Sequence, residues 1–414
     1  MNANKKKYLS LTMKKILFDS KLFILNMKLI YFLLCLLVAD VALAQQNSEK
    51  YLFVGTYTRG KSEGIYVYKF NCNSGKFKAV SVAKNIENPS FLSISPNEKY
   101  LYAVGEIDGE GAVSAFSFDK ESGELHKLNT QTAGGANPCH ISLDKTGKWA
   151  IVGNYTGGNL SILPIQSDGS LGKLLSTIQH TGKGTNTIRQ EKPHVHSINI
   201  APNNQDVFVA DLGIDKLMKY DLNVETGELT TTTPPYTSLA AGSGPRHLVF
   251  HPNGQWVYVI QELSSTITAM NYQKGSLLPF QTVTTLPKLY AQPSKNFSAD
   301  IHVSPDGKFV YGSNRFVDSV EGKNKFANDN FTDTIVIYAV NPKDGTLKYV
   351  GNEAVLGKVP RNFMITPNGK FMLVANQETD NITIFKRNSK TGKLKPLKTQ
   401  IAVPTPVCLK MVNF

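Results

Sequence analysis

The sequence predicts an all-β fold made of seven similar units, each with four short antiparallel strands. One strand pattern, seen as LFVGTY at Leu52–Tyr57 and MLVANQ at Met372–Gln377, recurs seven times, roughly every 50 to 60 residues. Six of the seven copies follow a segment such as Ser304-Pro-Asp-Gly307. Such segments form tight turns, because Pro fixes one φ and Gly or Asn accepts a positive φ. A second turn, with Gly two residues before Leu or Phe, also occurs seven times.

The strands and turns of each unit follow one another in a fixed order. We name the four strands A to D. A tight turn joins A to B, a loop leads to C, and a second tight turn leads to D. Strand C corresponds to segments such as Ile65–Phe70, Ile335–Val340 and Ile382–Phe385. Repeats of this length with four strands are typical of β-propeller blades, so we predict a seven-bladed β-propeller.

The two ends of the repeat array complement each other. The first unit begins at strand B with Tyr51, and Pro404–Phe414 resembles a single strand A. If these segments pair in one blade, the ring closes and both strand edges are covered. We therefore expect one propeller domain over residues 45–414.

Residues 1–44 resemble an N-terminal extension with a signal peptide over about 27–44. Lys28 precedes an apolar run, Leu29–Val38, and the segment ends in Ala42-Leu43-Ala44; this order of charge, apolar run and small residues is typical of secretory signals. Met27 is an alternative start. The expected location is exported and periplasmic, or cytoplasmic if the segment is not a signal, with no stable membrane anchor.

The charge and the cysteines exclude several classes of protein. The net charge of the chain is +13, and the segment 1–44 carries seven Lys and two Asp, which leaves +8 on the rest. No basic stripe interleaved with aromatic residues appears, so we expect no nucleic-acid partner. The odd number of cysteines after residue 44 (Cys72, Cys139 and Cys408) argues against a disulfide framework and for buried thiols.

The predicted topology identifies one face as the place for a site. The A–B and C–D turns share one face and are tight. The long segments, Ile178–Pro193, Pro287–Ser298 and Phe316–Phe331, all belong to D–A or B–C loops on the other face. Long loops on a rigid scaffold commonly carry function, so we expect the site at this mouth of the central channel.

Two repeated positions should lie at that mouth. Counting back along strand A gives Ser90, Cys139, His196, Arg246, Ala299, Arg361 and Val407, and the end of strand B gives Tyr57, Glu106, Tyr155, Leu212, Glu262, Arg315 and Gln377. The polar residues His194, His196, Arg246, His247, Glu262, Arg315 and Arg361 converge there. They suit a small anion and supply a general base. The alternatives are that each Arg is a rim salt-bridge partner, that His140, His247 and His302 line the channel, and that Asp211 and Asn314 cap loops.

Several motifs resemble those of the propeller lactonase family, which includes bacterial 6-phosphogluconolactonases and the fungal 3-carboxy-cis,cis-muconate cyclase. The motifs are Gly55-Thr-Tyr-Thr58, Pro193-His-Val-His196, Gly244-Pro-Arg-His247, Glu262, Ser313-Asn-Arg315 and Pro360-Arg-Asn362. The resemblance extends from Lys50 to Val412. It implies that a sugar lactone is hydrolysed by water without a metal or other cofactor. Glu262 or a histidine would take the proton of the water, and Arg246 would stabilise the oxyanion. Arg315 and Arg361 would hold a phosphate or carboxylate of the substrate.

The same resemblance implies roles for individual residues. His194 or His196, Arg246, Glu262 and Arg315 would be catalytic, and the choice between the two histidines stays open. Independently of the resemblance, we expect Arg361, His247, Asn314 and Gln377 at the same rim to bind substrate. The expected partner is a small anionic sugar lactone, and the sequence does not indicate an oligomeric state, although a monomer is compatible with it. The alternatives are a lactonizing cycloisomerase acting on a carboxylated substrate and a non-catalytic exported propeller that binds carbohydrate or protein.

Overall fold

The computed structural model describes residues 7–11, 13–14, 48–287, 296–316, 319–320, 323–324 and 333–413. The expected signal segment 27–44 lies outside these residues, as do most of the two loops 287–298 and 316–331 that were expected to be long. Residues 50–413 form one compact unit. Within the described residues, no helix is long and apolar enough to cross a membrane.

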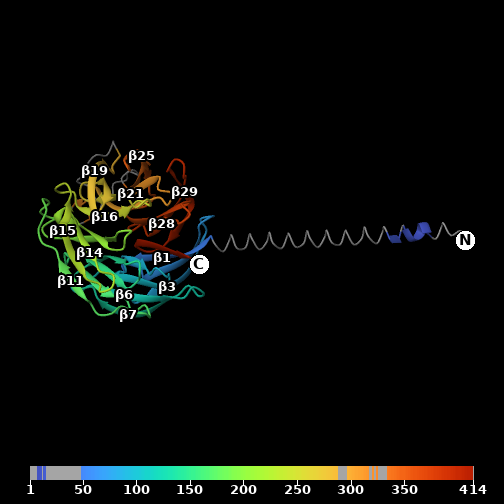
Figure 1. The fold of residues 1–414 in the computed structure, drawn as a ribbon, viewed down its shortest axis with the longest axis horizontal. Coiled ribbons are helices and arrows are strands. Elements are labelled where there is room, and N and C mark those ends of the chain that lie inside the picture. The colour runs from blue at the N-terminus through green and yellow to red at the C-terminus, as the bar shows by residue number, and fades with distance from the viewer. Residues whose placement is uncertain are drawn as a thin grey trace. The chain divides into compact units, whose positions relative to one another are not determined.

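The described part of this unit contains seven four-stranded antiparallel sheets, each a blade of the predicted propeller (Figure 1). The first three sheets, in spatial order from the outer to the inner strand, contain β3 (Phe77–Lys84), β2 (Gly64–Asn71), β1 (Glu49–Thr56) and β30 (Pro406–Asn413); β7 (Leu125–Thr132), β6 (Ala112–Phe118), β5 (Tyr100–Gly105) and β4 (Leu92–Ile94); and β11 (Ser176–Gln179), β10 (Asn159–Pro164), β9 (Trp149–Asn154) and β8 (Pro138–Leu143).

The other four sheets have the same order. They contain β15 (Leu229–Ser238), β14 (Lys216–Leu222), β13 (Asp206–Asp211) and β12 (Val195–Ile200); β19 (Ser276–Thr284), β18 (Thr266–Gln273), β17 (Trp256–Gln261) and β16 (Pro245–Phe250); β25 (Leu347–Ala354), β24 (Thr334–Val340), β21 (Phe309–Phe316) and β20 (Asn296–Val303); and β29 (Leu394–Ala402), β28 (Asn381–Arg387), β27 (Phe371–Asn376) and β26 (Pro360–Ile365). A short helical turn, η1 (Leu212–Ile214), and a small hairpin, β22 (Ser319–Val320) with β23 (Lys323–Asn324), interrupt the loops.

The ring closes as predicted. β1 pairs with β30 from Lys50 opposite Asn413 to Thr56 opposite Pro406, so the last strand of the chain is the innermost strand of the first blade. The innermost strands then contact one another in a full circle, in the order β4, β8, β12, β16, β20, β26 and β30. The seven-bladed β-propeller prediction is confirmed.

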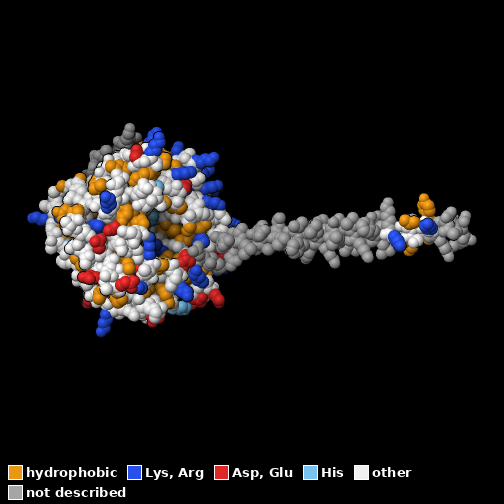
Figure 2. Space-filling model, viewed as in Figure 1, with side chains coloured by type: hydrophobic (Ala, Val, Ile, Leu, Met, Phe, Trp, Pro, Cys, Tyr) orange, Lys and Arg blue, Asp and Glu red, His pale blue; other side chains and the backbone are white. Residues whose placement is uncertain are grey.

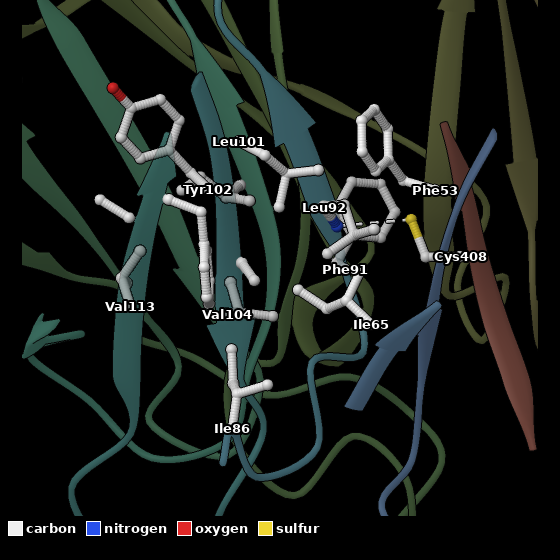
Figure 3. Packing of buried hydrophobic residues seen from close by; sticks show 14 of the residues in the cluster. Phe53, Ile65, Ile86, Phe91, Leu92, Leu101, Tyr102, Val104, Val113 and Cys408 are labelled. Carbon is white, nitrogen blue, oxygen red and sulfur yellow. Dashed lines mark hydrogen bonds between the residues drawn. The ribbon is translucent and has the colours of Figure 1, made fainter. Parts of the chain in front are cut away.

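The hydrophobic core lies between neighbouring blades. One cluster joins the first blade to the second: Phe53 and Cys408 come from the first, and Leu92, Leu101 and Val104 from the second. Figure 3 shows Cys408 on the last strand pointing toward Leu92, whose N–H donates a hydrogen bond to the Sγ atom at 3.3 Å. The closing strand is therefore held by packing as well as by its ladder. Cys72, Cys139 and Cys408 are buried free thiols, as expected.

The backbone conformation of each C–D turn requires a glycine. All seven glycines (Gly75, Gly123, Gly169, Gly227, Gly275, Gly345 and Gly392) have φ between +73° and +84°. At Gly345, φ is +76°, and an added Cβ would lie 2.5 Å from the ring of Trp256 in the preceding blade. The Gly345 carbonyl also accepts a hydrogen bond from Tyr258 Oη at 2.9 Å. The turn motif therefore also forms the contact between blades.

β-bulges in the innermost strands position the channel-mouth residues. The pairing register shifts between Pro138 and His140, between Val195 and Ser197, between Pro245 and His247, and between Pro360 and Asn362. In each strand the residue inside the bulge is one obtained by counting along strand A: Cys139, His196, Arg246 and Arg361. A bulge leaves one residue without a ladder partner and redirects its side chain.

Candidate active site

A pocket of about 320 Å³ lies at the channel mouth, on the face predicted to carry the site. Its lining residues are Tyr57, Glu106, Cys139, Tyr155, Arg189, His196, Glu262, Phe297, Arg315 and Arg361. Cys139, His196 and Arg361 occupy bulges, and Tyr57, Glu106, Tyr155 and Glu262 directly follow second strands of blades. The volume is at the lower end of the range for ligand pockets, which suits one small molecule.

Glu262 is the centre of a cluster of guanidinium groups. Its Oε1 accepts a hydrogen bond from Arg189 Nη2 at 2.6 Å, and its Oε2 accepts one from Arg315 Nη2 at 2.8 Å. Arg246 Nε lies 3.0 Å from the same Oε2, although this N–H is not aligned for a hydrogen bond. Both carboxylate oxygens therefore already have cationic partners.

These cations determine the charge state of Glu262. Burial by itself would raise the pKa of the carboxyl group, but Arg315, Arg189 and Arg246 outweigh burial and hold the pKa of Glu262 well below its usual range. Glu262 is consequently a permanent anion at neutral pH. Its charge partners the two buried guanidinium groups, Arg246 and Arg315, and the one-third exposed Arg189, since unpaired buried charges are costly.

Arg246 is fully buried and is held from behind. Its Nη1 donates to the carbonyl of Ala299 at 2.6 Å and lies 3.4 Å from His247 Nε2. His247 Nδ1 lies 2.8 Å from Asp300 Oδ1. The Nδ1–H group therefore donates a hydrogen bond to Asp300, and Nε2 is free to accept one from Arg246. Burial, together with Arg315 and Arg361, lowers the pKa of Arg246 to about 9, which leaves the guanidinium charged at neutral pH.

His196 is the histidine that faces the pocket. Its Nδ1 lies 3.9 Å from Cys139 Sγ and its Nε2 lies 4.0 Å from Glu262 Oε2, so neither ring nitrogen makes a short hydrogen bond within the described residues. Burial, followed by Arg246 and then His247, holds the pKa of His196 well below its usual range. The ring is therefore neutral at neutral pH and can accept a proton.

His194 lies behind the pocket wall. Its ring stacks on that of Tyr155 at a centroid distance of 4.5 Å. Its Nδ1 lies 3.1 Å from the Tyr155 carbonyl oxygen, and its Nε2 lies 3.1 Å from Glu191 Oε1. Both nitrogens of His194 are thus used to hold the wall, and His196 alone of this pair lines the pocket.

Three more of the predicted site residues have partners outside the pocket. His247 supports Arg246, as described above. Asn314 is fully buried and donates to Thr285 O at 2.8 Å and to Thr334 Oγ1 at 3.1 Å. Gln377 Nε2 donates to Glu378 Oε1 at 2.6 Å. These side chains do not line the pocket, whereas Glu262, Arg315 and Arg361 do.

Six lining residues had no predicted role. Tyr57, Glu106, Tyr155 and Cys139 stand at the two repeated positions noted in the sequence, so the repeat alignment was a usable indication. Arg189 lies in the long loop before β12, and its guanidinium lies over the ring of Phe297 at 5.4 Å. Loop length pointed to this segment, but no motif singled out Arg189.

A larger hollow, of about 860 Å³, lies among the A–B and C–D turns of the other face. Its lining includes Asp206, Lys219 and Tyr272. Asp206 accepts a hydrogen bond from Tyr272 Oη and pairs with Lys219 at 3.1 Å. No histidine or arginine of the described ranges lines this hollow, whereas His196 and three arginines line the smaller pocket, so we consider the smaller pocket the candidate active site. Within the described residues, no group of three or more His, Cys, Asp or Glu could hold a metal ion.

Residues 51–411 match the family model described as "Lactonase, 7-bladed beta-propeller". The chain is 39% identical over 368 residues to a 6-phosphogluconolactonase of Formosa agariphila, covering 88% of this chain and 99% of the relative. It is 37% identical over 367 residues to the 6-phosphogluconolactonase of Bacillus subtilis, with the same coverage.

Solved structures give the same result. A putative 6-phosphogluconolactonase from Bacteroides fragilis aligns with a TM-score of 0.81 at 41% identity, covering 89% of this chain and 99% of that one. The Pseudomonas aeruginosa periplasmic gluconolactonase aligns with a TM-score of 0.80 at 33% identity, covering 88% and 99%. With its fold, its pocket and these matches over most of its length, the chain belongs to the seven-bladed β-propeller lactonase family.

Proposed function

We propose that this protein hydrolyses the ester bond of a sugar lactone, as a 6-phosphogluconolactonase-like enzyme. The observation that supports the proposal best is the pocket itself. It combines a neutral histidine with no short hydrogen bond, His196, and cationic side chains that face a cavity of about 320 Å³. The names of the relatives point to the same reaction.

His196 is the proposed general base. Water attacks the lactone carbonyl carbon while its proton moves to a ring nitrogen of His196. The ring C–O bond then breaks, and the imidazolium returns the proton to the leaving alkoxide oxygen, so that a hydroxy acid is formed. Glu262, whose Oε2 lies 4.0 Å from His196 Nε2, stabilises the transient imidazolium. Proton transfer of this kind contributes on the order of 10²–10⁴ in rate.

Arg361 is the proposed oxyanion donor. It lines the pocket, and within the described residues its guanidinium makes no hydrogen bond; its one ionic partner is Glu106 Oε1, 3.9 Å from Nη2. Burial would lower the pKa of Arg361, but Tyr57 and Glu106 outweigh burial and raise the pKa. The guanidinium group therefore stays protonated at neutral pH. Arg246 lies behind Glu262, and its proposed role is to hold that carboxylate.

The substrate carries either a phosphate or only hydroxyl groups. Arg189 is one-third exposed and is suited to a substrate anion that projects from the pocket. An exported enzyme would meet unphosphorylated aldonolactones, and we propose export on the basis of the leader-like residues 27–44. The periplasmic gluconolactonase of P. aeruginosa is similar to this chain and offers a precedent.

The test is pH-stat hydrolysis of gluconolactone, its 6-phosphate and other lactones. We expect proton release above background for at least one lactone, and a loss on the order of 10²–10³ in kcat for Arg361→Gln. Lys370→Gln, an exposed change in a turn of the other face, serves as the control and should retain full activity. The proposal fails if no lactone is hydrolysed, or if Arg361→Gln and Glu262→Gln are both fully active.

A further inference from the structure

Glu106 differs from the other carboxylate of the pocket in its partners. Tyr57 Oη donates to the Glu106 carboxylate, at 2.9 Å from Oε2 and 3.0 Å from Oε1. Arg361 Nη2 is 3.9 Å from Oε1, beyond hydrogen-bond distance. Within the described residues, one phenolic proton is thus the single hydrogen bond to this carboxylate, although a carboxylate has about four acceptor positions.

The backbone of Glu106 is held in place from both sides. Its N–H donates to the carbonyl of Asn88 at 3.0 Å, and its carbonyl accepts from Asn88 Nδ2 at 3.1 Å. Asn88 Oδ1 in turn accepts from the N–H of Thr58 at 2.9 Å. The Glu106 and Tyr57 loops of neighbouring blades are joined through Asn88, so the carboxylate is preorganised for a ligand.

The open acceptor positions of Glu106 require hydrogen-bond donors. The other polar groups that line the pocket are mostly donors or are already paired: Arg189 and Arg315 with Glu262, and Arg361 beside Glu106. A second anion placed against Glu106 would be repelled, whereas a hydroxyl group would be bound. Two neighbouring hydroxyls of a sugar ring match the two oxygens of a fixed carboxylate.

We infer that Glu106 is the specificity-determining residue of the pocket, where it accepts hydrogen bonds from ring hydroxyls of the substrate. The inference rests on the proposed lactonase function and deepens it. The substrate is then a polyhydroxylated lactone. A lactone that presents a carboxylate to Glu106, as a carboxylated cycloisomerase substrate could, is rejected.

The kinetic test compares glucono-1,5-lactone with δ-valerolactone, which has the same ring and no hydroxyls. We expect the unmodified protein to prefer gluconolactone strongly in kcat/KM. Glu106→Gln should lower kcat/KM for gluconolactone on the order of 10- to 100-fold, mainly through KM. It should lower kcat/KM for δ-valerolactone much less, because that lactone has no hydroxyl groups to lose hydrogen bonds, although Arg361 loses its ionic partner with either substrate. Glu110→Gln, an exposed change in the same loop, should leave both values unchanged.

Tyr57→Phe provides a second variant if Glu106→Gln does not fold. It removes the phenol that orients Glu106 and should weaken the preference for gluconolactone by a smaller factor. The inference is overturned if either folded variant keeps the full preference for the hydroxylated lactone, even though lactone hydrolysis itself then stands.

A binding measurement separates the inference from the proposed function. 1,5-Anhydroglucitol has the ring hydroxyls but no ester, so it can bind without reacting. Calorimetry should show binding to the unmodified protein and at least 10-fold weaker binding to Glu106→Gln. If neither lactone is hydrolysed but this dependence on Glu106 holds, the proposed function fails and the hydroxyl site stands. Equal binding to both proteins overturns the site.

Discussion

At the residue scale, Glu262 and Glu106 occupy one pocket but have different surroundings. Three guanidinium groups lie within 3.0 Å of Glu262, while Glu106 receives one phenolic hydrogen bond. The first carboxylate offsets part of the positive charge of the three guanidinium groups, and the second retains free acceptor positions. Environments that separate two similar groups in this way usually separate their roles.

Replacement of the two histidines of the Pro193-His-Val-His196 motif should lower kcat to very different extents. We expect His196→Gln to lower kcat on the order of 10²–10⁴, because His196 lines the pocket, and His194→Gln to have a much smaller effect on kcat, because His194 supports Tyr155 from behind. Steady-state kinetics with the best lactone measures both. A greater loss of kcat in His194→Gln would contradict the assignment of the base.

The pH dependence of the reaction should report the low pKa of His196. The neutral ring is the active form, and a lowered pKa keeps the ring neutral into acid. We therefore expect kcat/KM, corrected for spontaneous hydrolysis, to stay level as the pH falls through 6.5 and to decline only well below it. NMR titration of the ring provides the independent measurement. In Arg361→Gln, where one of the cations that lower this pKa is absent, the titration should move to higher pH.

At the element scale, the innermost strands are tied together by one buried carboxylate. Asp300 on β20 accepts hydrogen bonds from His247 of β16 and, on β26, from the Asn362 side chain and the Phe363 N–H. Asn362 Oδ1 accepts from the N–H of Leu409 on β30 at 2.8 Å. Four blades thus meet at this network, which is linked to Glu262 of the pocket through His247 and Arg246. It holds Arg246 through His247, so blade packing and site geometry depend on each other.

The geometry of the C–D turns predicts how a glycine substitution changes the free energy of unfolding. Gly345→Ala should destabilise the protein by roughly 1–3 kcal/mol, because the residue has a positive φ and its Cβ would meet the Trp256 ring. Urea unfolding followed by fluorescence measures the change. Gly351→Ala is the matched control in the same blade, since nothing lies within 4 Å of its added Cβ. Equal stability of the two variants would count against this account of the turn.

At the scale of the whole molecule, the ring is closed by its last strand. β30 pairs with β1 and packs against β4 and β26. Without it, the first blade would lose its innermost strand and its edge would be open. On the face shown in Figure 2, acidic and basic side chains are interspersed.

Two truncations should therefore differ. A chain that ends at Pro404 should fail to fold cooperatively, as judged by circular dichroism and gel filtration. A chain that begins at Gln45 should fold and keep its activity, because the compact unit starts at Lys50. A cooperative, monodisperse product from the first truncation would show that closure by β30 is dispensable.

Much of the architecture could be predicted because it depends on local chemistry that repeats. Each A–B turn and each C–D glycine acts within a few residues, and the same strand pattern recurs in each unit. Seven copies make a weak local indication strong. Counting along strand A then located Cys139, His196, Arg246 and Arg361, which all proved to lie in bulges of innermost strands.

The sequence by itself thus determined the ring, its closure and the face that carries the pocket. Only the tertiary structure decided which polar residues of that face enter the cavity. His194 and His196 are two positions apart, yet a bulge turns the second inward and Tyr155 covers the first. Arg189 reaches Glu262 from a loop 73 residues away in sequence. Such contacts join different blades, and no local pattern records them because they exist only when the ring has closed.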